Sequence, residues 1–380
     1  MRYPRFSPAE LTRRHAALRE AMDARGIDEL VVYGRGPTAE ILYLCEWPGT
    51  RESYLLFPLR GDPTLFVQLH NHLPNAQRTA AIAEVRWAGP SSAATVADAL
   101  PERGRAGLVG PIPHQHHRAI VERCPALELV DASDLVTGLR LVKSAEEIER
   151  ARIAAGLTDR AMEALEREVR PGLREDELGA IVEAAYRREG GEVGIHFIAT
   201  TPMAAPEIGV PSQIASRRVI EAGDVLITEI SAAYRGYSGQ VHRAYAIAAE
   251  PTPAYREIHD VAVEAYARIV AVLRDGATAT QVLDAADVIH ERGYTVYDDL
   301  FHGMSQLPPI LQTRQTQRGP FREFTFRAGM CVVVQPNVIR DDSARMGLQV
   351  GSTLVITRDG AEDLHRYPMR FVVCGGEAGS

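Results

Sequence analysis

The sequence predicts a two-domain protein of the mixed α/β (α+β) class. Its 380 residues exceed what one hydrophobic core normally holds, so we expect two domains, residues 1–140 and 141–380. In the first, helical and strand-like segments alternate, which is typical of helices packed on a sheet. In the second, pairs of long helical segments precede strand-like runs, an arrangement that favours segregated helices and strands.

The first domain begins with a predicted helix over residues 8–25. Its apolar residues have helical spacing, and Ser7 is placed to cap it just before Pro8. Short runs of branched and aromatic residues then predict buried strands, separated by prolines and glycines. These runs are residues 29–33, 54–58, 63–69, 106–109 and 127–130.

The second domain follows a boundary near residues 137–144 and contains a predicted hairpin between two helix pairs. The hairpin is residues 223–246, where two strand-like runs flank a turn at Arg235-Gly236. The expected helices are residues 146–168, 175–190, 255–274 and 279–292.

The composition indicates an ordinary globular protein, with 46% hydrophobic and 24% charged residues. A net charge of -8 disfavours a nucleic-acid partner. No apolar run reaches membrane-spanning length, and the amino terminus lacks a signal-peptide core, so we expect a cytoplasmic protein without a membrane partner. The four cysteines lack metal-binding spacing and are predicted to be free thiols.

Five segments together resemble one family. They are LVKSAEEIERARIAAGL (residues 141–157), GDVLITEISAAYRGYSGQVHRAYA (223–246), FHGMSQLPPILQT (301–313), AGMCVVVQPNV (328–338) and GLQVGSTLVITRDGAEDL (347–364). These segments are similar to motifs of the creatinase/aminopeptidase P/methionine aminopeptidase family. The resemblance covers nearly the whole chain. It implies a creatinase-like amino-terminal domain followed by a pita-bread catalytic domain.

The resemblance also implies that the family's metal centre is altered. In its peptidases, carboxylate and histidine ligands at five positions hold two metal ions. Neutral amides and glycine are poor substitutes for carboxylates that must neutralise and bridge two cations. We therefore expect no metal and no cofactor, as in creatinase and ectoine hydrolase, the family's metal-free branch. The five positions here carry Glu229, Gln240, Gln306, Gln335 and Gly351.

Three residues are predicted to be catalytic: Glu229, His242 and His302. The resemblance places a Glu at the first position in ectoine hydrolase, and His302 keeps a histidine of the family's HG segment. Strand alternation puts Gln240 and His242 on one face, which Glu229 on the opposing strand can reach. A converging Glu and His can divide acid and base roles, or the Glu can act as a nucleophile. The structural alternative is a polar pair that only satisfies buried hydrogen bonds.

The predicted substrate contacts are amides. Gln240, Gln306 and Gln335 are expected to form a neutral cavity that recognises amides, carboxylic acids or ureido groups through paired donors and acceptors. Their alternative interpretation is degeneration of a dead site. Ser212 stands where creatinase and ectoine hydrolase have a histidine. It is either a nucleophile activated by His242 or His302, or a turn residue.

The resemblance further implies a homodimer. In dimeric creatinases an aromatic residue and an arginine from the partner's amino-terminal domain close the active site. Trp47 and Arg51, on the Pro-Gly loop of residues 45–54, occupy the corresponding segment. They are expected to supply an apolar wall and a carboxylate clamp.

These observations favour a metal-independent enzyme of creatinase type. The expected reaction is cleavage of an amide, amidine or ureido-type C–N bond in a small polar molecule. Two other classes stay open: a catalytically inactive pita-bread binding protein, and a metal-free lyase, isomerase or cyclase that uses the emptied pocket. Retention of Glu229, His242 and His302 in one predicted cavity favours an enzyme over an inactive protein.

Overall fold

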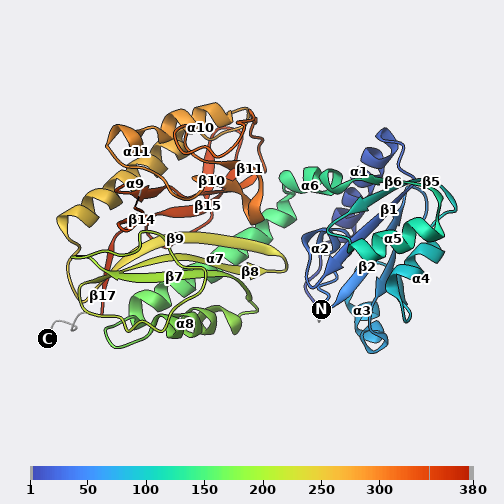
Figure 1. Cartoon of the computed structure of the whole chain (residues 1–380), viewed down its shortest axis with the longest axis horizontal. Coiled ribbons are helices and arrows are strands. Elements are labelled where there is room, and N and C mark those ends of the chain that lie inside the picture. The colour runs from blue at the N-terminus through green and yellow to red at the C-terminus, as the bar shows by residue number, and fades with distance from the viewer. Residues whose placement is uncertain (1–2, 342, 376–380) are drawn as a thin grey trace. The chain divides into compact units, whose positions relative to one another are not determined.

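The protein is described here by a computed structural model that covers residues 3–341 and 343–375. The chain divides into two compact units, Met1–Arg140 and Leu141–Ser380 (Figure 1). Both combine helices with a sheet, which confirms the predicted mixed α/β class.

In the described part of the first unit, six strands form one sheet in the order β4-β3-β2-β1-β5-β6. The pairs β1–β2 and β2–β3 are antiparallel, and the remaining pairs are parallel. The strands are β1 (Glu29–Arg35), β2 (Glu52–Pro58), β3 (Thr64–Val67), β4 (Glu84–Trp87), β5 (Arg103–Val109) and β6 (Ala126–Asp131). The helices are α1 (Pro8–Ala24), α2 (Ala39–Cys45), α3 (Leu73–Thr79), α4 (Ser92–Ala99), α5 (His114–Arg123) and α6 (Ser133–Leu141), with a 3₁₀ turn η1 (His70–His72).

Alternating side chains of β1 and β2 divide the apolar residues of this unit between two core clusters. Leu30 and Val32 belong to one cluster, and Val31 and Tyr33 belong to the other. The helix expected over residues 8–25 is α1, and the Ser7 hydroxyl accepts a hydrogen bond of 3.1 Å from the backbone N–H of Glu10. The five expected strands are confirmed. The sequence analysis did not predict β4 or the helices α2 to α6.

The second unit is built on a larger sheet. Within the described residues its path is β11-β10-β12-β15-β9-β8-β7, with β16 beside β15 and β17 beside β9. Its strands are β7 (Glu192–Pro202), β8 (Asp224–Tyr234), β9 (Tyr237–Ile247), β10 (Phe301–Gly303), β11 (Leu307–Leu311), β12 (Cys331–Val334), β15 (Gly351–Ile356), β16 (Ala361–Asp363) and β17 (Val372–Cys374). A separate pair is formed by β13 (Asn337–Ile339) and β14 (Gly347–Gln349).

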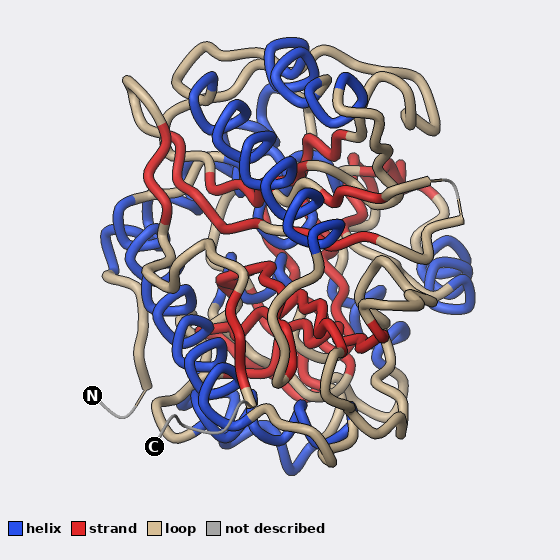
Figure 2. The backbone as a smooth tube through the Cα atoms, turned by 90° about the vertical axis from the view of Figure 1, so that its left-hand side faces the viewer, coloured by secondary structure: helices blue, strands red, loops and turns tan. Residues whose placement is uncertain are grey.

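Helices cover this sheet on both sides (Figures 1 and 2). The long α7 (Ala145–Glu168) packs on β8 and β9 and beside α8 (Glu175–Arg187). On the other side lie α9 (Pro253–Val272), α10 (Ala279–Ala286) and α11 (Val288–Glu291). The helix expected over residues 279–292 is present, but Asp287 divides it into α10 and α11.

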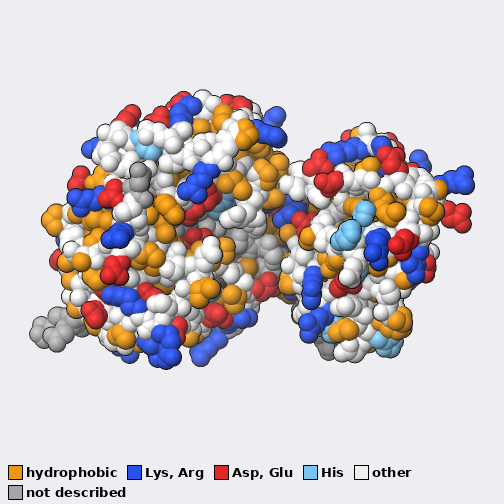
Figure 3. All heavy atoms as spheres, viewed as in Figure 1, with side chains coloured by type: hydrophobic (Ala, Val, Ile, Leu, Met, Phe, Trp, Pro, Cys, Tyr) orange, Lys and Arg blue, Asp and Glu red, His pale blue; other side chains and the backbone are white. Residues whose placement is uncertain are grey.

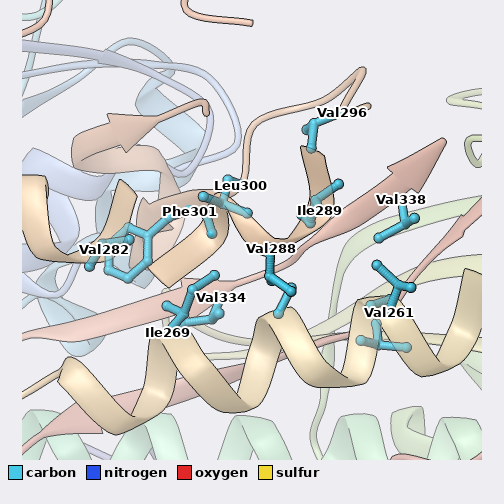
Figure 4. Packing of buried hydrophobic residues seen from close by; sticks show 14 of the residues in the cluster. Val261, Ile269, Val282, Val288, Ile289, Val296, Leu300, Phe301, Val334 and Val338 are labelled. Atoms are coloured by element: carbon cyan, nitrogen blue, oxygen red, sulfur yellow. The ribbon is translucent and has the colours of Figure 1, made fainter. Parts of the chain in front are cut away.

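Apolar packing holds α9 against the strands. Val261 and Ile269 of α9 belong to one buried cluster with Val288, Phe301 and Val334 (Figure 4). Burying a side chain of this size contributes roughly 1.5–3 kcal/mol. This packing fixes β10 and β12, the strands that carry or adjoin part of the site described below.

The predicted hairpin is confirmed as β8 and β9. Its two-residue turn places Arg235 (φ 51°) and Gly236 (φ 85°) in the left-handed region, as a type I′ turn requires. The turn fixes the register, so Glu229 lies opposite His242 and Ser231 lies opposite Gln240.

Acidic, basic and apolar side chains are interspersed on the face of each unit shown in Figure 3. No helix within the described residues is both long and apolar enough to span a membrane.

Candidate active site

Six polar side chains meet inside the second unit, and we call them the amide–histidine cluster. Strands β8, β9, β10 and β14 and the residue that follows β12 supply them. Because these strands approach from distant parts of the sequence, the cluster depends on the folded sheet. Its members and their exposed fractions are Glu229 (6%), Gln240 (4%), His242 (0%), His302 (1%), Gln335 (2%) and Gln349 (0%).

The side-chain nitrogen of Gln240 is the centre of the cluster. Gln240 Nε2 lies 3.0 Å from Glu229 Oε1 and 3.0 Å from Gln335 Oε1. It also lies 3.1 Å from His242 Nε2 and 3.4 Å from His302 Nε2. An amide nitrogen carries two hydrogens, so it can donate fully to two of these four atoms.

The neighbouring backbone decides which two atoms accept. Gln335 Nε2 donates to the carbonyl oxygen of Asp299 at 3.1 Å, so Gln335 Oε1 faces Gln240. Gln240 therefore donates to Gln335 and to the Glu229 carboxylate. His302 Nδ1 lies 2.8 Å from the carbonyl oxygen of Gly303, which makes Nδ1 the donor and leaves a lone pair on Nε2.

His242 is the other tautomer, with its ring hydrogen on Nε2 instead of Nδ1. Its Nδ1 accepts from Gln349 Nε2 at 2.6 Å, so the ring hydrogen is on Nε2. That N–H faces the Gln240 nitrogen, which has no lone pair to offer, and so it stays available to an external acceptor. Burial lowers the pKa of His242 well below its ordinary value, and the charges that His302 and Arg243 carry when protonated act in the same direction. Burial also lowers the pKa of His302. Both rings are neutral at pH 7.

Glu229 is a carboxyl group with an unusual pKa. Burial raises its pKa to about 7, the negative charge of Asp298 adds to the rise, and a hydrogen bond with Gln349 opposes it. A carboxyl group that titrates near neutral pH is suited to take up and release a proton during a reaction. The predicted convergence of Glu229, His242 and His302 is confirmed, while their catalytic roles stay predictions.

Two aspartates adjoin the cluster and were not predicted from the sequence. Burial raises the pKa of Asp299 to about 8, and its hydrogen bond with Asp298 and the charges of Asp298 and Glu229 act in the same direction. Gln349 was also not predicted. The sequence offered one signal for it: Gln349 stands two residues before Gly351. In the structure it ends a strand that pairs with residues 337–339.

The structure leaves no room for a side chain at position 351. A Cβ atom on Gly351 would lie 2.9 Å from His242 Cδ2 and 2.5 Å from the carbonyl oxygen of Val334. The His242 ring thus occupies the space beside this position, and Gly351 pairs directly with His242 in the sheet. A side chain at position 351 would therefore conflict with both the backbone after β12 and the His242 ring.

The structure does not place Gln306 in the amide cavity that the sequence predicts, and its substrate contact stays a prediction. Strand β10 ends at Gly303, and Ser305 (φ 58°) and Gln306 (φ 60°) then adopt left-handed backbone. This turn leaves Gln306 exposed, outside the cluster. Gln349 instead joins Gln240 and Gln335 as the third amide.

Ser212 is half-buried in the loop before the hairpin, and its carbonyl oxygen accepts from the backbone N–H of Ile198 at 3.1 Å. Among the described residues, no hydrogen bond joins its hydroxyl group to His242 or His302. The turn interpretation therefore has the better support, and the substrate contact stays a prediction.

Trp47 and Arg51 belong to the first unit. Trp47 is 5% exposed, packs in the core, and donates from Nε1 to the Ser53 hydroxyl at 3.0 Å. This burial does not favour its expected role as an apolar wall for a neighbouring subunit. Arg51 is exposed. Its role as a clamp stays a prediction.

The amide–histidine cluster does not fit the metal pair that the resemblance implies. Within residues 3–341 and 343–375, no group of three or more His, Cys, Asp and Glu side chains is arranged to hold a metal ion. The Gln240 amide hydrogens point at the same acceptors that would otherwise face a cation. Two divalent ions need several carboxylates, and here Glu229 is the one carboxylate among the six cluster residues.

Comparison with protein families gives two matches. Residues 149–358 match the model of metallopeptidase family M24. Residues 14–142 match the model of the creatinase/prolidase amino-terminal domain. The chain is 27% identical over 262 residues to a Xaa-Pro dipeptidase of Pyrococcus furiosus, covering 68% of this chain and 72% of that protein. It is 25% identical over 270 residues to a Xaa-Pro dipeptidase of Pyrococcus horikoshii, covering 70% and 74%.

Solved structures confirm the fold. The prolidase from Pyrococcus horikoshii OT3 superposes with a TM-score of 0.80 at 22% identity, covering 94% of this chain and 99% of that one. The dipeptidase PepE from Mycobacterium ulcerans gives a TM-score of 0.80 at 25% identity, covering 97% and 99%. The creatinase-like and pita-bread domains expected from the resemblance are thereby confirmed.

Proposed function

The chain belongs to metallopeptidase family M24, and we propose that it cleaves a C–N bond of a small polar molecule without a metal ion. The amide–histidine cluster carries this proposal, because Glu229 has a pKa of about 7 beside two neutral histidines. The candidate bonds are amide, amidine and ureido bonds, all of which the neutral glutamines are suited to recognise. The relatives named above are called Xaa-Pro dipeptidases, and a peptide bond falls within this class.

Glu229 supplies the base. In the proposed reaction its ionised carboxylate removes a proton from water, and the water oxygen forms a bond to the carbon of the substrate. The C–N bond then breaks with its electron pair on nitrogen, and Glu229 returns the proton to that nitrogen. A residue whose pKa lies near the working pH serves both steps.

The two histidines have complementary roles. The Nε2–H of His242 is the donor left without an internal acceptor, so it binds the oxygen or nitrogen on which negative charge develops. A neutral imidazole can polarise a carbonyl group in this way. His302 Nε2 is an acceptor, and it orients the attacking water or a substrate N–H.

One observation favours a second candidate, an inactive binding protein. The six cluster side chains are each at most 6% exposed and largely satisfy one another's hydrogen bonds. A polar network of this kind can also serve only to hold the strands together.

The test is single-turnover hydrolysis of small amides, amidines, ureido compounds and Xaa-Pro dipeptides, with a chelator present. Glu229→Gln keeps the size of the side chain but removes its basicity, so the rate should fall roughly a hundredfold to ten-thousandfold. Glu122→Gln, at a position whose side chain is 63% exposed, is the matched control and should keep the rate. Equal rates for all three proteins, or no turnover of any compound by the wild type, would favour the binding protein.

The remaining expectations concern the binding partners, the oligomeric state and the cellular compartment. We propose that the partner is a small-molecule substrate, that the protein is a homodimer, and that it acts in the cytoplasm. The dimer is supported by the exposed position of Arg51 between α2 and β2, and its test is given below.

A further inference from the structure

Gln349 joins the amide–histidine cluster through its side-chain nitrogen. Its Nε2 lies 2.6 Å from His242 Nδ1, a shorter contact than the 3.0 Å between Gln240 Nε2 and Glu229 Oε1. Gln349 is the last residue of β14, pairs with Asn337 and is 0% exposed. Because strand pairing fixes its backbone and close packing restricts its side chain, the amide holds one position beside the histidine ring.

Glu229 decides which end of this amide faces His242. The two hydrogens on Gln349 Nε2 bond to His242 Nδ1 and to the Glu229 carboxylate. At the other end of the amide, Oε1 is buried and has no hydrogen-bond partner among the described residues, which typically costs about 1–3 kcal/mol. Turning the amide over would set its oxygen against the carboxylate, so that two acceptors faced each other. The ionised carboxylate therefore keeps the amide nitrogen towards the ring.

The amide nitrogen in turn decides the tautomer of His242. A neutral imidazole has one ring hydrogen, so a donor at one nitrogen places that hydrogen on the other. Gln349 thus puts the hydrogen of His242 on Nε2, the atom that lies 3.1 Å from Gln240 Nε2. For His302 the backbone makes the choice, because the carbonyl oxygen of Gly303 accepts from Nδ1. The tautomer of His242 depends on one side chain, and a single substitution can release it.

We propose that Gln349 is a positioning residue of the reaction, which makes His242 a hydrogen-bond donor at Nε2 and keeps it so while Glu229 is ionised. This deepens the proposed function, and it rests on that function for the word reaction. A histidine in the other tautomer would present a lone pair where developing negative charge needs a donor. Gln349 acts through His242 rather than on the substrate.

The tautomers are measured by ¹⁵N NMR of protein labelled at histidine, because ring nitrogens with and without a hydrogen give different signals. The wild type should carry the ring hydrogen on Nε2 in His242 and on Nδ1 in His302. His242→Asn and His302→Asn each remove one of the twelve sets of ring signals, which assigns them.

Two substitutions at position 349 change the donor. Gln349→Glu supplies a carboxylate that accepts from Nδ1, so the ring hydrogen of His242 should move to Nδ1 at pH 8. Gln349→Met keeps the length of the side chain but forms no such hydrogen bond, so His242 should become a mixture of both tautomers. His302 should keep its tautomer in both variants. Gln115→Glu and Gln115→Met make the same changes on an exposed side chain of α5 and should change neither ring.

Turnover gives the second readout. Gln349→Glu should lower kcat roughly a hundredfold, the effect of losing one oriented donor, while KM changes by less than about threefold. Gln349→Met should lower kcat by less than about tenfold, because part of its population keeps the productive tautomer. The Gln115 variants should keep the wild-type kcat. Near-native circular dichroism of all four variants establishes that they fold.

Three results would overturn the proposal. They are a wild type with the ring hydrogen of His242 on Nδ1, an unchanged His242 tautomer in both Gln349 variants, and an unchanged kcat in Gln349→Glu despite an inverted tautomer. Because the NMR measurement needs no turnover, the proposed function fails separately. An inactive wild type whose His242 tautomer depends on Gln349 would refute the hydrolysis and support the positioning contact.

Discussion

Glu229 and His242 face each other across β8 and β9, and each has a pKa moved towards its neutral form by burial. A carboxylate in a closed, neutral environment is costly when it is ionised. The Glu229 carboxylate accepts from Gln240 and has a hydrogen bond with Gln349, and these contacts offset only part of that cost. Retention of a destabilising charge is typical of functional sites rather than of structural ones.

This cost predicts a pH dependence of stability. The folded-state pKa of Glu229 is about 7, above its ordinary value of 4.5, so folding favours the protonated form. The protonated Glu229 side chain contributes to the free energy of unfolding. That contribution is fully present below pH 4.5 and is lost as the pH rises through about 7. The difference corresponds to about 3 kcal/mol of unfolding free energy.

Glu229→Gln should remove that dependence. We expect the variant to gain stability over the wild type as the pH rises from 5 to 8, by up to about 3 kcal/mol. Urea denaturation at both pH values measures the difference, and Glu122→Gln is the control. An unchanged difference between pH 5 and pH 8 would show that Glu229 is ionised at little cost, and its proposed role as a base near neutrality would lose support.

At the scale of the elements, the β8–β9 hairpin positions three of the six cluster residues. Its turn places Arg235, a residue with a side chain, in left-handed backbone at φ 51°. Such backbone costs a residue with a Cβ roughly 1–2 kcal/mol, and asparagine tolerates it best after glycine.

Arg235→Asn should therefore stabilise the hairpin. We expect an increase in unfolding free energy of about 0.5–1 kcal/mol without a change in ligand binding, because five residue pairs separate the turn from the Glu229–His242 pair. Thermal and urea unfolding measure the gain. Arg235→Val, which is branched at Cβ, should destabilise the protein; a stabilising valine would contradict the turn assignment.

The sequence predicts this hairpin well because its signals are local. The Arg-Gly turn fixes the register, and period-2 alternation puts Gln240 and His242 on one face. Gln306 was misplaced because two left-handed residues other than glycine, Ser305 and Gln306, turn the chain outward, and no sequence pattern marks them. Gln349 reaches the cluster from a strand more than 100 residues from His242, so long-range pairing rather than local pattern places it.

At the scale of the whole molecule, the fold of a metallopeptidase family surrounds a cluster with the wrong charges for two metal ions. The purified protein should contain well under one equivalent of manganese, zinc, iron or cobalt per chain. Chelators should leave its melting temperature unchanged, because no metal-binding free energy contributes to folding. Elemental analysis with two tightly bound metal ions per chain would contradict this prediction.

The last prediction concerns assembly. If Arg51 completes the site of a neighbouring subunit, the protein is a homodimer, and Arg51→Ala weakens binding of a carboxylate-bearing substrate while the subunit stays folded. Arg51 is the cleaner probe of the loop, because Trp47 is buried in the core and its removal would cost roughly 3–5 kcal/mol of stability.

Sedimentation equilibrium and ligand titration of the same samples provide the measurement. We expect a dimer for the wild type and for Arg51→Ala, with affinity reduced about tenfold in the variant, the effect of losing one charge-assisted contact. Arg60→Ala removes a charge from the turn after β2 and is the control. A fully active monomer at micromolar concentration would exclude a shared site. A dimer in which Arg51→Ala binds normally would show that the two subunits associate without exchanging residues between their sites.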